Sequence, residues 1–233
     1  RIGGTINDDS GAFNIGDVES LVNGSLSDTF SIQINDVSQL GIIEASVGSN
    51  ATLDAGLSNS NGDILVQATE DIDMRAWAGA AAIGAVGFGG AVSVTFVKSE
   101  QVAFIDNGAT LAAADDITVE ATLNNVSDVN AYGGAAGAVG LGAQVVIYRD
   151  DATQLAFMDD GTSSSNAVKV TSADDVKVRA YANRDIDVHA QGASAGAIAA
   201  GAAAGEIRVG GSTLAYLGEY TQEGQSSGTV NDV

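Results

Sequence analysis

The stretch AWAGAAAIGAVGFGGAVSVTFV, Ala76–Val97, is 22 residues long, carries no charge and contains five glycines. It returns twice along the chain. The first return is AYGGAAGAVGLGAQVVIY at Ala131–Tyr148, aligned without a gap 53 residues further on, and the second is AQGASAGAIAAGAAAG at Ala190–Gly205. A repeat of this length around an apolar centre of small residues indicates a stacked array of similar units.

Each copy of this Gly/Ala stretch is flanked by two strand patterns. Before it, an acidic turn leads into alternating apolar residues, which is typical of a half-buried strand. These segments are Asp63–Ala68, Asp116–Ala121 and Asp175–Ala180. A closing strand follows each copy at Gln101–Asp106, Gln154–Asp159 and Thr213–Gly218, with one more upstream at Gln39–Glu44. We therefore expect repeats over residues 39–218, in about three units of 53–63 residues.

The two ends of the chain differ from the repeat. Residues 1–38 fit it poorly, and we interpret them as a cap or as the tail of a preceding unit. Residues 219–233 form a polar tail without an amphipathic element. The chain begins at Arg1 with neither an initiator methionine nor a signal-peptide pattern, so we interpret it as a mature product or an excerpt of a longer protein.

Three structures are possible for the Gly/Ala stretch. A membrane-spanning helix would fit the apolar length, but each glycine costs a helix about 1 kcal/mol relative to alanine, and no basic cluster flanks the stretch to orient it. A long strand that is apolar, and therefore buried, on both faces is favoured. The fold class we predict is all-β, a repetitive parallel β-solenoid. The alternative is a stack of antiparallel β-hairpins bent at Gly133-Gly134.

The size of one layer is a separate question. Glu120 and Arg179 occupy equivalent places in consecutive units. Because a single layer of more than 50 residues would be unusually wide, we expect each unit to form more than one coil. The two residues would then lie about 10 to 15 Å apart, since paired strands are about 5 Å apart.

Composition excludes several partners. Thirty acidic residues against nine basic ones give a formal net charge of −21. Phosphate binding needs a basic surface, so nucleic acid is excluded and an anionic membrane surface is disfavoured. The chain has no cysteine for disulfides or thiolate chemistry. It has no proline either, as expected where most backbone N–H groups donate to ladders.

Few residues indicate chemistry. The only histidine, His189, has no second histidine or cysteine with which to form a transition-metal site, and we interpret it as a surface residue. We expect no catalytic residues and no enzyme activity. Calcium is the one cofactor that the sequence suggests, because carboxylate oxygens at turns suit it. The weak candidate ligands are the paired aspartates Asp115, Asp116, Asp159, Asp160, Asp174 and Asp175. Neither a calcium β-roll nonapeptide nor an EF-hand loop is present.

The order of closing strand, acidic turn, D-[IV]-x-V-x-A strand and Gly/Ala stretch resembles repeats of large secreted bacterial β-solenoid adhesins, over about residues 39–218. These are the filamentous-haemagglutinin-like, leukotoxin-type and autotransporter-type adhesins. The resemblance implies an extracellular or cell-surface shaft and carries no catalytic residues.

The function expected from the sequence is a structural segment of an extracellular bacterial fibre or adhesin shaft. Its expected partners are itself, in a head-to-tail filament, or further repeats of the same chain, together with surface glycans or a host or neighbouring cell surface. No membrane insertion is expected. The alternatives are a carbohydrate-active β-helix enzyme and a calcium-dependent ligand-binding module.

Overall fold

The computed structural model describes residues 28–36, 41–56, 62–161 and 166–218. These residues form fourteen strands and no helix. The strands before the first complete coil are β1 (Asp28–Asp36), β2 (Ile42–Val47) and β3 (Thr52–Ala55). The first coil contains β4 (Ile64–Ile83), β5 (Val86–Val97), β6 (Glu100–Ile105) and β7 (Thr110–Ala113). The second contains β8 (Ile117–Ala136), β9 (Val139–Asp150), β10 (Thr153–Met158) and β11 (Lys169–Ser172). The last contains β12 (Val176–Ala195), β13 (Ile198–Val209) and β14 (Thr213–Leu217).

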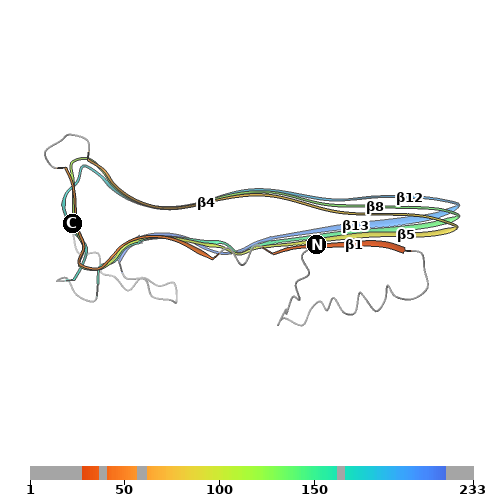
Figure 1. Cartoon of the computed structure of the whole chain (residues 1–233), viewed down its shortest axis with the longest axis horizontal. Helices are drawn as coiled ribbons and strands as arrows, with labels where there is room; N and C mark the ends of the chain where they lie inside the picture. Colours follow the sequence, from red (N-terminus) through yellow and green to blue (C-terminus); the bar gives the residue numbers. More distant parts are fainter. Residues whose placement is uncertain (1–27, 37–40, 57–61, 162–165, 219–233) are drawn as a thin grey trace.

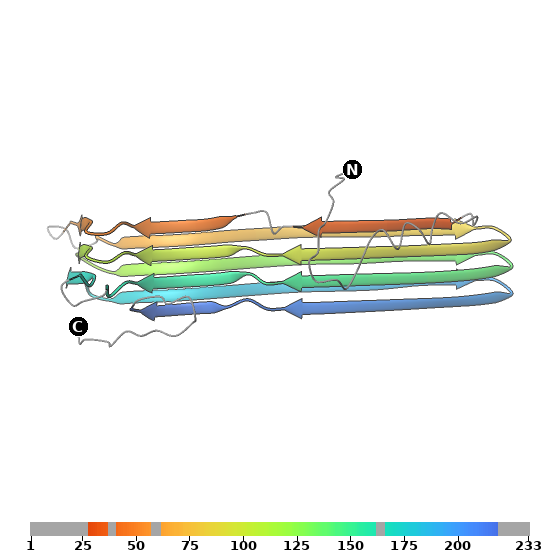
Figure 2. The same ribbon diagram turned by 90° about the horizontal axis from the view of Figure 1, so that it is seen from below.

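Equivalent strands of successive coils pair with one another. The four sheets have the orders β1-β5-β9-β13, β14-β10-β6-β2, β11-β7-β3 and β12-β8-β4. Every pairing is parallel, with Val86 opposite Val139 and Val139 opposite Ile198. We call the sheet of the three longest strands, β4, β8 and β12, the long sheet. The long sheet and the sheet that contains β5 lie as two layers in Figure 1, and the coils follow one another along the stack in Figure 2. The chain is therefore an all-β parallel β-solenoid, and the alternative of stacked antiparallel hairpins is wrong.

One repeat unit forms one coil, contrary to our expectation of several. Arg179 pairs directly with Glu120 on the neighbouring strand, where parallel strands are about 4.8 Å apart. The coil accommodates a whole unit because it is flat. A strand of 20 residues runs outward, and strands of 12 and 6 residues return along it. The short strand β7 then closes the narrow end.

The Gly/Ala stretch is not one strand buried on both faces. It divides at Gly84-Ala85, where β4 ends and β5 turns back over it in another sheet. In the part of the stretch that belongs to β4, the inward alanines are buried, whereas Ile83 is 89% exposed on the outer face. At this bend an added Cβ on Gly137 would overlap the carbonyl oxygen of Gly84 in the coil below. The described part of the chain contains no helix with the length and hydrophobicity to cross a bilayer.

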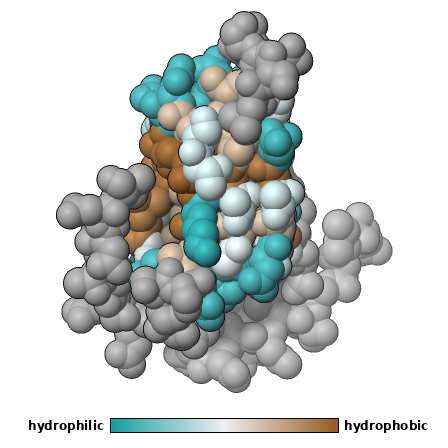
Figure 3. Space-filling model, turned by 90° about the vertical axis from the view of Figure 1, so that its left-hand side faces the viewer, coloured by the Kyte–Doolittle hydropathy of each residue, from teal (hydrophilic) through white to brown (hydrophobic). Residues whose placement is uncertain are grey.

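The core lies between the layers, and its strand residues are buried in the first two complete coils and more exposed in the last. The alternation in the three strand patterns predicts that Ile64, Val66, Ile117, Val119, Val176 and Val178 are buried, and the first four are. The prediction is wrong for the last coil, where Val176 is 41% exposed and Val178 is half-buried, because no described coil covers them. The narrow end of the molecule is seen in Figure 3, where hydrophilic residues cover the top and front and hydrophobic ones appear at the flank.

The repeat also extends further towards the N-terminus than residue 39. Strand β1 lies within the segment 1–38 and pairs in register with β5, from Asp28 opposite Phe88 to Asp36 opposite Phe96. The described part of this segment therefore contributes one strand to the layer that precedes the first complete coil. The polar tail 219–233 lies outside the described residues.

Candidate functional site

The most extensive candidate site is the pair of open ends of the stack. The N-terminal rim is formed by β1, β2, β3 and β4, and the C-terminal rim by β11, β12, β13 and β14. Each of these strands is the outermost described strand of its sheet. An edge strand presents unpaired N–H and C=O groups, which are a template for a further strand. Both rims can therefore accept more β-structure of the same kind.

The C-terminal rim also exposes the side of the core. All twelve residues of β13 are exposed, although its register partners on β9 include the buried Val146 and Tyr148. A shallow depression of about 300 Å³ opens here, bordered by Gln144, Ser194 and Ala203 among others. In the stacked coils, apolar and small side chains at these positions are covered by the next coil. The rim is thus shaped like an interior layer without its neighbour.

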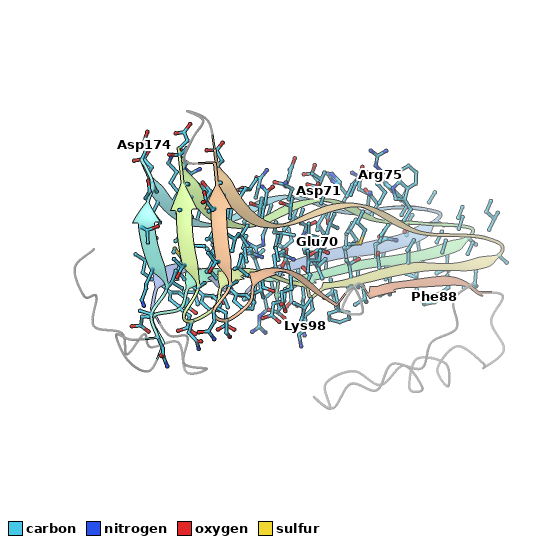
Figure 4. The ribbon with its side chains drawn as sticks, turned by 60° about the vertical axis from the view of Figure 1, so that its left-hand side comes forward. Glu70, Asp71, Arg75, Phe88, Lys98 and Asp174 are labelled. Carbon is cyan, nitrogen blue, oxygen red and sulfur yellow. The ribbon has the colours of Figure 1, made fainter. Side chains whose placement is uncertain are left out.

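The charges are distributed unequally along the stack. Five of the eight described basic side chains lie on strands of the C-terminal rim: Lys169, Lys177, Arg179, Arg184 and Arg208. The first coil is acidic, and its strand β4 carries Glu70, Asp71 and Asp73 against one basic residue, Arg75. Figure 4 shows Glu70 between the layers, while Asp71 and Arg75 point outward from β4. The two rims are therefore electrostatically different: the N-terminal rim is acidic, whereas the C-terminal rim carries cations together with the carboxylates Asp185, Asp187 and Glu206.

The cations of the last coil pair with carboxylates of the coil below. Lys177 forms an ion pair with Asp116 and lies 3.2 Å from Asp175. Arg179 lies 3.9 Å from Glu120. The amino group of Lys177 has a raised pKa because it donates hydrogen bonds to Asp116 and Asp175. These partly exposed pairs contribute little each, typically below about 1 kcal/mol, but they fix which charges meet between coils.

A line of polar side chains runs through the interior parallel to the stack axis. Gln101 donates from Nε2 to Glu70 and, at 3.0 Å, to Ser99 Oγ. Gln154 of the next coil donates to Gln101 Oε1 at 2.9 Å, and Thr213 of the last coil donates to Gln154 Oε1 at 2.9 Å. Gln101 and Gln154 are fully buried. Because buried polar groups are costly when unpaired, this ladder favours the register in which equivalent residues stack.

A second polar cluster joins the last two coils. The buried Asp150 carboxylate accepts hydrogen bonds from Asn125 Nδ2 at 2.8 Å and from Arg184 Nε at 3.0 Å. Asn125 also donates to the Tyr148 hydroxyl at 2.8 Å, and that hydroxyl donates to Ser127 Oγ at 3.1 Å. Burial raises the pKa of the Tyr148 hydroxyl above its usual 10.0, and the Asp150 carboxylate raises it further. A buried ion pair of this kind specifies a unique packing more than it adds stability.

The calcium candidates divide into two groups. Asp115 and Asp116 precede β8, and Asp174 and Asp175 precede β12, so these four lie at the same corner of adjacent coils. Asp159 and Asp160 follow β10 at the next corner, where Asp159 Oδ1 accepts a hydrogen bond from the Gly161 N–H at 2.7 Å. Among the described residues, no group of three or more carboxylate or imidazole side chains is placed to hold a metal ion. Calcium binding therefore stays a prediction.

We call the turn before β8 and β12, with its four aspartates, the acidic corner. The pKa of Asp115 shows the repulsion between carboxylates there. Partial burial raises the pKa of the Asp115 carboxyl above its usual 3.8, and repulsion from Asp63, Asp116 and Asp174 adds to this rise. Lys177 opposes it. The corner is thus a place where negative charge accumulates along the stack and where one more cation would relieve repulsion.

His189 lies on the outer face of β12 and is exposed. Its register partner on β8 is Asn130, whose partner on β4 is Trp77. Sequence reasoning did not single out these neighbours, nor the Glu70–Gln101 and Asn125–Tyr148–Asp150 contacts. The equivalent positions of Gln101 and Gln154 in successive units were the available signal for the interior ladder.

Comparisons with known proteins add no assignment: no protein-family model, no curated protein and no solved structure matches this chain.

Proposed function

We propose that the chain is a structural segment of an extracellular bacterial fibre or adhesin shaft whose coils continue end to end. The observation that carries this proposal is that, among the described residues, the outermost strands at both rims have no further strand partner, and at the C-terminal rim all twelve residues of β13 are exposed. Natural repeat arrays need polar terminal caps, because an uncovered layer exposes apolar side chains and unpaired backbone groups. Open rims at both ends instead suit continuation, either by further repeats of the same chain or by a second copy.

The distribution of charge supports a fixed direction of continuation. In a head-to-tail arrangement the cation-bearing C-terminal rim faces an acidic N-terminal rim. A head-to-head arrangement would bring two acidic first coils together, and like charges at short range are unfavourable. A heterologous contact that does not close on itself produces a filament. This geometry suits a shaft, which extends a distal part away from a surface.

The number of described strands in each sheet determines which strands are missing from a joint between two copies. The sheets built on β5 and β6 have four strands each, whereas those built on β7 and β4 have three. If β1 of one copy lies over β13 of another, one further long strand must fill the gap between β12 and β4. One further short strand must likewise continue the β3 sheet. The joint therefore requires about half a coil beyond the described strands, from the same chain or from its continuation.

Sedimentation velocity over a range of concentrations, with electron microscopy of the same samples, tests the proposal. The wild-type chain should form end-to-end oligomers. Ala203→Lys places a charge on the inward face of β13, where it would be buried in a joint, and should keep the chain monomeric. The matched control Ala202→Lys places the same charge on the outward face and should assemble like wild type. A wild-type chain that stays monomeric at high concentration, with both ends of its stack covered by its own residues, would defeat the proposal.

A further inference from the structure

The outer face of the long sheet carries two exposed aromatic side chains near the bend. Trp77 of β4 is 64% exposed and Tyr132 of β8 is 40% exposed. Their ring centroids are 6.1 Å apart and the ring planes meet at 69°, an edge-to-face pair. Aromatic rings are large apolar surfaces that are usually covered in a soluble protein. A pair held together in solvent therefore calls for an explanation.

The surroundings of the pair form a shallow platform. Outward side chains at paired positions of β4, β8 and β12 form a column across the sheet. The column of Tyr132 also contains Gly79 and Gln191, and the next column towards the bend contains Ala81, Gly134 and Ala193. These small residues leave an open depression of about 690 Å³ beside the Tyr132 ring. The floor is flat because the strands are paired in register. The ring of Tyr132 and the amide of Gln191 border it.

Hydrogen bonds hold the side chain of Tyr132 in place at the border of the platform. Tyr132 donates from its hydroxyl to Asn130 Oδ1 at 2.9 Å, and Asn130 donates to the Asp128 carboxylate. Asn130 is only 2% exposed although it lies on the outer face, because it is held between Trp77 and its neighbours. A network that fixes a side chain before binding lowers the entropy lost when a ligand binds. The platform is therefore preorganised.

We propose that this platform binds a neutral saccharide. A pyranose ring has an apolar face of C–H groups that can stack on an aromatic ring, and its hydroxyls can hydrogen-bond to the amide of Gln191 at the border of the depression. The positive hydrogens of those C–H groups suit the negative face of an aromatic ring. The net charge of −21 disfavours sulfated, sialylated or other anionic glycans. The combination of a stacking ring with an amide that both donates and accepts hydrogen bonds matches a neutral ligand rich in hydroxyl groups.

The single tryptophan makes the test direct. Trp77 is the only tryptophan in the chain, so its fluorescence reports on this platform alone. The chain is titrated with soluble neutral polysaccharides, namely a β-glucan, a mannan and a galactan, and with heparin as an anionic comparison. At least one neutral polysaccharide should shift the emission of Trp77 to shorter wavelength with saturation, and heparin should not. Native gels that contain the same polysaccharide should retard the chain.

Substitutions distinguish stacking of a sugar ring on Tyr132 from nonspecific binding elsewhere on the outer face. Tyr132→Ala should weaken binding about tenfold, equivalent to about 1.4 kcal/mol, whereas Tyr132→Phe keeps the ring and should lose less. The matched control is Tyr181→Ala. Tyr181 is 49% exposed on the same outer face, but its column lies eight residues from that of Trp77, or about 27 Å along the strands. This control should bind like wild type.

Three results would overturn the proposal. One is the absence of any fluorescence shift or gel retardation with the neutral polysaccharides. Another is equal weakening by Tyr132→Ala and Tyr181→Ala. The third is a blue shift of Trp77 that depends on protein concentration without any saccharide, together with loss of lateral dimers in Trp77→Ala. That last result would assign the face to contact between copies. None of these outcomes depends on whether the coils continue end to end.

Discussion

Individual glycines determine how closely the two layers approach at the bend. Gly89, Gly142 and Gly201 occupy equivalent positions in successive units, and this recurrence predicts a place where backbones leave no room for a side chain. An added Cβ on Gly89 would overlap the carbonyl oxygen of Gly134, so the expectation is confirmed there. On Gly142 it would lie 3.0 Å from the Ser194 hydroxyl, a side chain that can move. On Gly201 the nearest atom is 3.4 Å away, an ordinary contact.

The different contacts at these three glycines predict that substitution by alanine changes the free energy of unfolding by different amounts. Gly89→Ala should lower the free energy of unfolding by about 1–3 kcal/mol, because the backbone must shift to relieve overpacking. Gly201→Ala is the matched control. It should be neutral or slightly stabilising, since alanine restricts the unfolded chain. Guanidinium unfolding followed by circular dichroism measures both. Equal stabilities for the two variants would contradict the close approach at Gly89.

The sequence predicted residues within a strand better than contacts between strands. The alternation in Asp63–Ala68 and its two copies correctly placed Ile64 and Val66 in the core, because neighbouring residues decide period two. The contact between Glu70 and Gln101 joins residues 31 apart, and it depends on β6 returning beside β4. No local pattern contains that information. The same holds for Asp150 and Arg184, which are 34 residues apart.

At the scale of elements, the Gly/Ala stretch shows why its bend was not predicted. Glycines occur at several positions between Ala76 and Val97, and each tolerates a turn. Apolar residues on both sides suggested a strand buried on both faces, whereas the outer face is open and only the inner one is packed. The parallel repeat was predicted because identical segments recur in the same order. The number of coils was not, since a flat coil of unequal strands leaves no periodicity within one unit.

The acidic corner before β8 and β12 predicts a pH and calcium response. The folded pKa of Asp115 is raised above 3.8. Its stabilising contribution is therefore complete below pH 3.8 and is lost as pH rises through the folded pKa. At pH 7 the ionised corner is repulsive. Asp115→Asn should consequently raise the melting temperature at pH 7 and leave it unchanged below pH 3.8, and millimolar calcium should raise the melting temperature of wild type.

The control for this prediction is Asp185→Asn, which removes the same charge from the exposed face of β12, away from the corner. It should leave the calcium response intact, whereas Asp115→Asn should reduce it. A calcium shift that is identical in both variants would mean that calcium only screens the net charge. That outcome would remove the corner as a calcium site.

The whole molecule is a directional stack with two opposing electrostatic effects. Its net charge of −21 keeps separate stacks apart. The joint between rims depends mainly on backbone ladders and apolar side chains, because a further long strand separates the cations of β12 from the carboxylates of the next β4. Ladders and apolar contacts are insensitive to salt, whereas repulsion between exposed charges is screened over about 10 Å at 0.1 M salt and about 3 Å at 1 M.

Filaments of this chain should therefore thicken when salt is added. Raising the salt concentration from 0.01 M to 1 M should increase the fibre width seen by electron microscopy as stacks associate laterally, because screening removes repulsion between them. The strands lie across the fibre axis, so fibre diffraction should give a meridional reflection near 4.8 Å at both salt concentrations. Charge pairing is the competing explanation for the joint, and it predicts the opposite response. If high salt converts filaments into single chains, the rims are joined by ion pairs rather than by continuous strand ladders.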